Sequence, residues 1–223
     1  KGIKEVNYSI SDPDIRTFQK AKSLLNKSKI KVNVGILKKN SLNFYKSYFL
    51  SKSKSSLPYT DIKIAISKDY YSINRKGKWI TNLISRTKGH LLRSKYDCIL
   101  STYKSVNKDN SLLNCRINGL EHLSPSRVII DKNLRLSKKL KIFNTSHKIK
   151  TYVITCKDDK NKEKFLKSKK IKIIKLEYQK NLISYRDILM KLKEKGFSRI
   201  LCESGSFTAS NLLKNNLVNN IYV

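Results

Sequence analysis

Apolar residues recur along the chain in short runs that are typical of buried strands, and segments of helical length separate these runs. The segment 59–66 alternates, with Ile62, Ile64 and Ile66 on one side and Lys63 and Ala65 on the other. Later runs predict strands at 98–101, 127–131, 151–155, 171–176 and 199–202. Helices are predicted at 82–95, 160–169, 184–195 and 207–215. This alternation predicts an α/β fold with a mostly parallel sheet and flanking helices on both faces.

The first fifty residues carry a pattern of their own. A strand is predicted at 5–10, and Asp12-Pro13-Asp14 predicts a turn and the start of a helix. A second strand at 30–35 and a helix at 41–49 follow. This β-α-β-α segment, 1–50, is too short to form a domain alone and is interpreted as the end of one. Small polar residues closed by Pro58 make 51–58 the predicted linker, and 59–223 the second domain.

The composition fits a globular protein with a core, since 39% of its residues are hydrophobic. No stretch resembles a signal peptide and no apolar run reaches about 18 residues, so we expect a cytoplasmic protein without membrane contact. The widely spaced Cys98, Cys115, Cys156 and Cys202 predict buried thiols of a reducing compartment rather than a zinc knuckle. Because the chain opens on a lysine and stops inside a strand-like run, we expect a fragment at both ends.

The formal net charge of +33 raises the question of a nucleic-acid partner, because basic surfaces bind phosphate. The cations are mostly lysines scattered from end to end, and no RNA-recognition signature is present. We expect no nucleic acid, and a lysine-rich RNA-associated protein is the alternative. Against this lysine background, Arg86, Arg93, Arg116 and Arg127 predict positions where a planar donor binds phosphate or carboxylate. For Arg86, an ordinary surface charge is an equal alternative.

A candidate anion site follows the predicted strand at 199–202. Glu203-Ser204-Gly205 lies between that strand and a predicted helix, and ligands of parallel sheets bind beyond the carboxyl ends of the strands. Gly205 and the helix N-terminus would offer backbone N–H groups to a phosphate. Neither a Gly-x-Gly-x-x-Gly fingerprint nor a Walker loop occurs in the chain.

Several motifs occur in the order and at nearly the spacing of one known family. They are the segments 63–69, 78–81, 86–93, 109–116, 127–131 and 203–205. Over about residues 59–223 the chain resembles the reductase half of the bifunctional riboflavin-biosynthesis deaminase/reductase family. Residues 1–50, with Asp12-Pro13-Asp14, resemble the last part of that family's cytidine-deaminase-like domain.

This resemblance implies a dihydrofolate-reductase-like α/β fold that is incomplete at its C-terminus. It implies NADPH as cofactor and a phosphorylated pyrimidine, 5-amino-6-(5-phosphoribosylamino)uracil, as the substrate whose ribosyl chain is reduced to a ribityl chain. It also implies that the full-length protein is a homodimer with a zinc deaminase portion. The His-x-Glu and Pro-Cys-x-x-Cys motifs of zinc deaminases do not occur here, so zinc is expected only in that portion and no metal site in this chain.

The resemblance also assigns site residues by position. The implied substrate-binding residues are Arg93, Leu113, Arg116 and Glu203. Lys63 and Glu203 are implied as catalytic, and our hypothesis is that Lys63 helps to protonate the nitrogen or oxygen as hydride arrives. The implied cofactor-binding residues are Ala65, Trp79, Ser105, Asp109, Gly205, Ser206, Phe207 and Thr208. The alternatives are an outward surface lysine for Lys63, a core aromatic for Trp79 and a turn or cap residue for Asp109.

The chain departs from the family pattern at several positions, among them two loops. Tyr70 stands where the family has glycine, and 102–105 replaces a glycine-bearing loop with side chains that would crowd the cofactor phosphates. A reductase-like domain that has lost catalysis and serves as a partner of a deaminase is therefore a second hypothesis. Another reductase of the same fold, acting on a dihydrofolate or a pterin, is a third, although the paired Arg93 and Arg116 favour a phosphorylated substrate.

Overall fold

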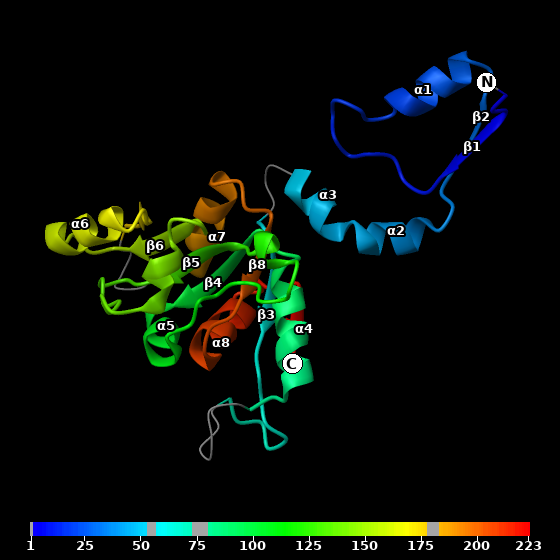
Figure 1. Ribbon diagram of the computed structural model, residues 1–223. Coiled ribbons are helices and arrows are strands. Elements are labelled where there is room, and N and C mark those ends of the chain that lie inside the picture. The colour runs from blue at the N-terminus through cyan, green and yellow to red at the C-terminus, as the bar shows by residue number, and fades with distance from the viewer. Residues whose placement is uncertain (1, 53–56, 73–79, 178–182) are drawn as a thin grey trace. The chain divides into compact units, whose positions relative to one another are not determined.

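The computed structural model describes residues 2–52, 57–72, 80–177 and 183–223 (Figure 1). The chain divides into two compact units, Lys1–Leu57 and Pro58–Val223. Each unit is described by itself. Among the described residues, no helix combines the length and the apolar character that crossing a membrane requires. The expected cytoplasmic location stays a prediction.

The first unit holds a two-stranded parallel sheet and three short helices. Its strands are β1 (Glu5–Tyr8) and β2 (Lys31–Val34), and its helices are α1 (Lys20–Lys27), α2 (Lys38–Phe44) and α3 (Lys46–Lys52). Both strand predictions are confirmed. The predicted helix at 41–49 is instead divided at Tyr45, which is the C-cap of α2.

The prediction of a helix that starts directly after Asp12-Pro13-Asp14 is wrong, because α1 begins only at Lys20. The Asp14 carboxylate accepts hydrogen bonds from Arg16 Nε at 2.9 Å and from Lys52 Nζ at 2.6 Å, so it ties a turn to α3. Among the residues described in this unit, Asp14 alone is buried. A polar contact, rather than an apolar core, therefore links its parts.

The second unit is a seven-stranded sheet with helices around it (Figure 1). Its strands are β3 (Tyr59–Lys63), β4 (Cys98–Thr102), β5 (Ser126–Ile130), β6 (Thr151–Thr155), β7 (Lys172–Lys175), β8 (Arg199–Cys202) and β9 (Asn220–Tyr222). Its helices are α4 (Leu83–Arg93), α5 (Tyr103–Asp109), α6 (Lys160–Ser168), α7 (Tyr185–Glu194) and α8 (Ser206–Lys214), with 3-10 turns η1 (Glu121–Leu123) and η2 (Lys141–Thr145). The strand order is β7-β6-β5-β4-β8-β3-β9.

Every strand pairing recorded between described residues is parallel, so the prediction of a mostly parallel sheet is confirmed. The central strands carry apolar side chains on both faces, as β4 and β8 show with Ile99, Leu100, Ile200 and Leu201, all inaccessible to solvent. Strands buried on both faces lie between two layers of other structure. The sequence of strand, helix and strand therefore gives the expected three-layer α/β architecture.

β3 differs from its prediction in length and in pattern. The strand ends at Lys63, and Thr60, Asp61 and Ile62 are all buried, so its side chains do not alternate between core and solvent. β3 lies between β8 and β9 rather than at an edge, and a central strand of a parallel sheet is covered on both faces. The Asp61 carboxylate accepts a hydrogen bond from the hydroxyl of Tyr96, which gives this buried acid a partner.

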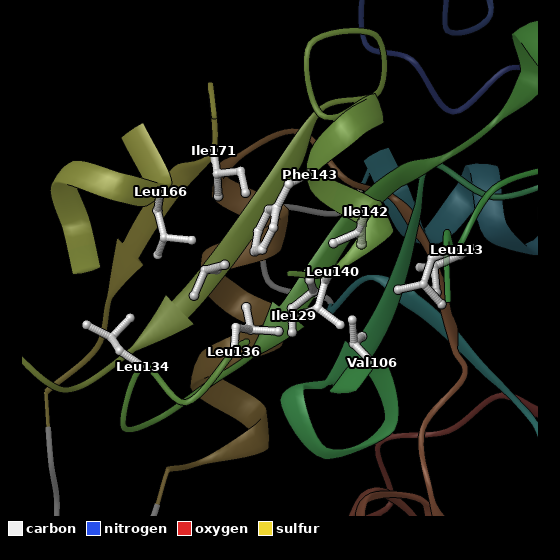
Figure 2. Packing of buried hydrophobic residues seen from close by; sticks show 12 residues of the cluster. Val106, Leu113, Ile129, Leu134, Leu136, Leu140, Ile142, Phe143, Leu166 and Ile171 are labelled. Carbon is white, nitrogen blue, oxygen red and sulfur yellow. The ribbon is translucent and has the colours of Figure 1, made fainter. Parts of the chain in front are cut away.

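One large apolar cluster packs beside β5 and β6 (Figure 2). It joins α5, through Val106, to α6, through Leu166, and the ring of Phe143 stacks edge-on with that of Phe165 at 5.3 Å. The remaining members are Ile99, Leu113, Ile129, Leu134, Leu136, Leu140, Ile142, Val153 and Ile171. The cluster fixes both α5 and the loop at Leu113 relative to the sheet.

Arg127 lies in the core and does not form the phosphate or carboxylate contact that its residue type predicts. Its side chain is inaccessible to solvent, and its guanidinium donates to the hydroxyls of Thr145 and Thr151 at 2.7 Å each. It also donates to the carbonyls of Leu112, Ile142 and Ile149. The planar donor is used, as expected, but its acceptors are neutral oxygens of the fold. Burial lowers the pKa of Arg127 to about 10.

Candidate active site

β4, β8 and β3 are parallel neighbours in the sheet, so their carboxyl ends lie side by side at the same end of the strands. This end of the strands is called the sheet edge below. β3 and β8 are in register up to Ile62 and Cys202, so Lys63 and Glu203 follow at the same level on neighbouring strands. β4 is anchored beside them, because Ser101 Oγ donates to the Glu203 carbonyl at 2.8 Å. The strand register thus brings together two predicted catalytic residues that are far apart in sequence.

Glu203 forms a two-pronged ion pair with Arg93 at the end of α4. Arg93 Nε and Nη2 donate to the two carboxylate oxygens at 2.7 Å each, and the side chains are only 15% and 12% exposed. Burial alone would raise the pKa of Glu203, but the hydrogen bonds and the charge of Arg93 outweigh it and hold that pKa below its usual value. The carboxylate is therefore ionised at neutral pH and its orientation is fixed on one side.

A loop after α5 brings Arg116 to the same place. Arg93 Nη1 donates to the Asn114 carbonyl at 2.9 Å, and His90 Nδ1 lies 3.0 Å from the same oxygen. Arg116 Nε and Nη2 lie 3.2 and 3.1 Å from His90 Nε2. The predicted pair of guanidiniums, Arg93 and Arg116, therefore flanks one imidazole.

α4 has local reasons to form where it does. Its N-cap Asn82 accepts a hydrogen bond from the Ser85 N–H at 2.9 Å, and the cation Arg93 stands in its last turn, three residues after His90. Cations near a helix C-terminus interact favourably with the helix dipole, and residues three apart lie on one face. Arg86 instead donates to the Thr81 carbonyl at the opposite end of the helix. The structure thus separates Arg86 from the group around Arg93.

Lys63 is half-buried and is not an outward surface lysine. Its stem passes α4 at Gly89, where Lys63 Cε lies 3.9 Å from the position a Cβ would occupy. Its charge also contributes to lowering the pKa of Glu203, after the larger effect of Arg93. Lys63 and Glu203 thus follow the ends of two neighbouring strands and interact electrostatically.

The predicted anion site would lie at the N-terminus of α8. Gly205 is its N-cap, and a Cβ built there meets no atom within 4 Å. Ser206 and Phe207 begin the helix with exposed side chains, and the first N–H groups of a helix have no intrahelical acceptor. Thr208 is buried, with its hydroxyl 3.4 Å from that of Tyr185, so it faces the interior rather than this end.

The segment 102–105 is not the loop that the sequence comparison predicts, because it forms the first turn of α5. Thr102 is the N-cap, and its hydroxyl accepts from the Ser105 N–H at 3.4 Å. The ring of Tyr103 packs against the core cluster, so only Lys104 is exposed in this turn. The expected crowding of a phosphate by several side chains is therefore reduced to one flexible lysine.

The other predicted cofactor residues lie in different surroundings. Ala65 follows β3 at the sheet edge, whereas Asp109 is exposed in the last turn of α5, at the far end of that helix from Ser105. Asp109 is thus neither a turn residue nor a cap. Trp79 lies outside the described residues. Among the implied substrate residues, Leu113 turns its side chain into the core with a φ of +48°, so only its backbone can face a ligand.

Tyr70 adopts the backbone conformation that a glycine would adopt. Its φ is +65°, and the turn is closed by hydrogen bonds from the Ser67 N–H to the Tyr71 carbonyl at 2.9 Å and from the Tyr71 N–H to Ser67 Oγ at 3.0 Å. A left-handed conformation costs a non-glycine residue about 1 kcal/mol or more. The turn after β3 therefore places a non-glycine residue in a left-handed conformation, at the position where the resemblance implies a glycine.

Breaking the ion pair of α4 and β8 should destabilise the second unit. We expect Glu203→Gln to lower the free energy of unfolding by about 2 kcal/mol at pH 7, because glutamine keeps one acceptor oxygen but the charge-assisted hydrogen bonds to the largely buried Arg93 are weakened. The loss should shrink when Arg93→Met is added, as a double-mutant cycle in urea measures. Since the folded pKa of Glu203 is depressed, the stabilisation should also disappear as pH falls below the usual glutamate range. Glu194→Gln, at an exposed pair on α7, is the matched control.

Sequence reasoning assigned no role in the site to His90 or to Asn114. His90 stands three residues before Arg93, which places both on one face of a helix and was a usable signal. Asn114 acts through its backbone carbonyl, which no residue type reveals. The direction of this carbonyl depends on the conformation of the loop, and that conformation depends on the packing of Leu113 in the core.

Comparison with known proteins identifies the second unit. Residues 58–223 match the family described as RibD C-terminal domain. The riboflavin biosynthesis protein RibD of Aquifex aeolicus is 30% identical over the whole chain, which covers 61% of that protein, and that of Actinobacillus pleuropneumoniae is 26% identical, with 59% covered. The chain thus spans about three fifths of the curated relatives it matches.

Solved structures of RibD proteins are also similar to this chain. The Thermotoga maritima structure described as a diaminohydroxyphosphoribosylaminopyrimidine deaminase/5-amino-6-(5-phosphoribosylamino)uracil reductase is 26% identical with a TM-score of 0.76, covering 96% of this chain and 57% of that one. Acinetobacter baumannii RibD, at 22% identity and a TM-score of 0.78, covers 98% and 59% and supports the fold. The chain belongs to the RibD C-terminal domain family.

Proposed function

We propose that this chain contributes the reductase activity of a riboflavin-biosynthesis oxidoreductase. The reaction is the NADPH-dependent reduction of 5-amino-6-(5-phosphoribosylamino)uracil to its ribityl product. The observation that supports it best is the group at the sheet edge, where Lys63, the Arg93–Glu203 pair and Arg116 surround one place beyond β3 and β8. This arrangement offers an ammonium group, a fixed carboxylate and a guanidinium to a polar, phosphorylated substrate.

Arg116 is the proposed phosphate ligand. Its side chain is exposed, and its Nε and one Nη2 hydrogen face His90, which leaves the edge formed by Nη1 and Nη2 for two parallel hydrogen bonds to a phosphate. Arg93 already donates three N–H groups to Glu203 and Asn114, so its main proposed role is to hold that carboxylate. Glu203 then accepts hydrogen bonds from sugar hydroxyls or from the pyrimidine ring.

Lys63 is the proposed proton donor. The open form of the sugar is a carbonyl or an imine at C1′, and reduction there requires a proton on the neighbouring oxygen or nitrogen. An ammonium group held beside the Glu203 carboxylate can deliver that proton directly or through a water molecule. The remaining task of the chain is to hold C1′ of the sugar close to the hydride donor in one orientation.

The residues at the N-termini of α5 and α8 fit a dinucleotide phosphate. The open space at Gly205 lets the ligand approach the backbone, and Ser206 adds an exposed hydroxyl at the positive end of α8. Ser105 and Lys104 stand in the first turn of α5, which follows β4, and β4 pairs with β8. NADPH, when bound, supplies the hydride of the reaction. Ala65, Asp109 and Trp79, the last of which lies outside the described residues, stay predictions as cofactor contacts, as do the homodimer and the zinc deaminase of the longer protein.

NADPH oxidation by the intact protein tests this function. With the deaminated phosphoribosylaminouracil as substrate, we expect oxidation that depends on substrate, and an Arg116→Ala variant whose KM is about tenfold or more higher, because a charge-assisted contact to phosphate is lost. Arg135→Ala, at an exposed arginine after β5, is the control. A folded wild type that gives no oxidation, and whose melting temperature NADPH does not raise, would favour the reductase-like domain without catalysis.

A further inference from the structure

His90 lies between Arg93 and Arg116, and each of its ring nitrogens contacts the loop that contains Asn114 and Arg116. Its Nδ1 is 3.0 Å from the Asn114 carbonyl, and its Nε2 is 3.2 Å from Arg116 Nε and 3.1 Å from Arg116 Nη2. The side chain is half-buried in the last turn of α4. The imidazole therefore connects a fixed helix to the arginine that is proposed to meet the phosphate.

The partners of the ring determine where its proton lies. A carbonyl oxygen only accepts hydrogen bonds, and a guanidinium only donates them. Nδ1 must then carry the hydrogen and donate to Asn114, while Nε2 presents its lone pair to Arg116. Arg93 Nη1, which is 3.3 Å from Nδ1, donates to the Asn114 carbonyl instead, at 2.9 Å. Only the neutral Nδ1–H tautomer satisfies all of these contacts.

The surrounding charges disfavour a second proton on this ring. Arg93 lies on the same helix and Arg116 on the loop after α5, and both are cations, whereas Glu203 at the end of β8 is the nearby anion and is already paired with Arg93. Lys63, from β3, adds a further positive charge beside Glu203. Burial, followed by the charges of Arg93 and Arg116, lowers the pKa of His90.

We propose that neutral His90 is a positioning residue that holds Arg116 for the phosphate of the substrate, and that protonation of its imidazole releases Arg116. A protonated Nε2 would direct an N–H at the N–H groups of Arg116 and would add a like charge at hydrogen-bond distance. The inference rests on the proposed function, in which Arg116 binds phosphate. It predicts that phosphate-ester affinity falls as the pH drops through the His90 titration, while affinity for NADPH does not follow it.

Calorimetric binding of ribose 5-phosphate to the intact protein between about pH 5 and 8 tests this inference. His90→Leu should weaken binding at pH 8 by about tenfold or more, because the acceptor for Arg116 is lost. His90→Gln restores an oxygen acceptor that cannot titrate, so it should recover most of the affinity. His122→Gln, at an exposed histidine in η1, is the matched control.

The pH profiles separate His90 from the ligand itself. A phosphate monoester ionises near pH 6, and that dependence should remain in every variant. Wild type should show an additional weakening that approaches about tenfold per pH unit below the His90 pKa, and His90→Gln should lack it. Identical profiles for wild type and His90→Gln, or unchanged affinity in a folded His90→Leu variant, would overturn the proposal. So would the absence of ribose 5-phosphate binding by wild type.

Two further readouts keep this inference separate from the reductase activity. The ring ¹⁵N signals of His90 should show a protonated Nδ1 and an unprotonated Nε2 at pH 8, and the opposite tautomer would contradict the proposal. If wild type binds ribose 5-phosphate with this pH dependence but does not oxidise NADPH, the proposed function fails and the His90 role stands. If oxidation proceeds and His90→Leu has an unchanged KM, only the His90 role fails.

Discussion

Replacing Lys63 by methionine is expected to lower kcat by about a hundredfold or more, which is the range that a positioned general acid contributes. Methionine keeps the length of the stem that lies against Gly89, so packing with α4 should persist. The affinity for NADPH should change little, because the phosphates are assigned to α5 and α8 rather than to β3. Single-turnover kinetics beside NADPH binding measures the two effects separately.

The control for this variant is Lys164→Met, at an exposed lysine of α6. Equal losses of turnover and of NADPH affinity in Lys63→Met would show that Lys63 serves binding in general and would remove it as proton donor. A solvent isotope effect on kcat that increases in the variant would support the assigned role, since proton delivery would then limit the rate.

Replacing Arg127 by methionine is expected to lower the free energy of unfolding by about 3 to 5 kcal/mol. The carbonyl of Leu112 and the hydroxyl of Thr145 accept from Arg127, and each buried acceptor left without a donor costs about 1 to 3 kcal/mol. The carbonyls of Ile142 and Ile149 would keep the hydroxyls of Thr145 and Thr151 as donors. The hydroxyl of Thr151, which accepts at 2.7 Å, loses its donor as well. Urea unfolding followed by circular dichroism measures the change.

Arg186→Met, at an exposed arginine of α7, should change stability by less than about 0.5 kcal/mol and is the matched control. Arg127→Lys keeps the charge but has no planar fork, so it should recover only part of the loss. A stability of Arg127→Met equal to that of wild type would mean that the core rearranges to satisfy these oxygens, and that the arginine is not the link between β5, β6 and η2.

The strands were the most predictable part of this protein. The segments 151–155 and 199–202 form β6 and β8 with the predicted limits, because runs of β-branched and apolar residues between helices leave few other arrangements. The convergence of Lys63 and Glu203 follows from the same pattern, since carboxyl ends of neighbouring parallel strands share an edge. The family motifs named these residues, and the strand register explains why they meet.

Contacts that depend on tertiary structure were less predictable. The pattern at 59–66 suggested alternation, but insertion of β3 between β8 and β9 buried both faces, and only the strand order determines that. Arg127 was selected as an anion ligand because residue type reports the need for a planar donor and not the identity of its acceptors. The first turn of α5 was expected to be a loop because Thr102 was compared with a glycine-bearing motif, whereas its capping hydroxyl favours a helix.

The position of β3 in the sheet also has a consequence for biosynthesis of the protein. β3 is the first strand of its unit to leave the ribosome, yet both of its neighbours, β8 and β9, are the last. About 140 residues separate Ile62 from its partner Cys202, which corresponds to a delay on the order of ten seconds at ordinary rates of translation. During that interval neither edge of β3 has its partner strand. The site residues Lys63 and Glu203 can meet only after β8 has been synthesised, so no nascent chain that stops before Glu203 carries the assembled site.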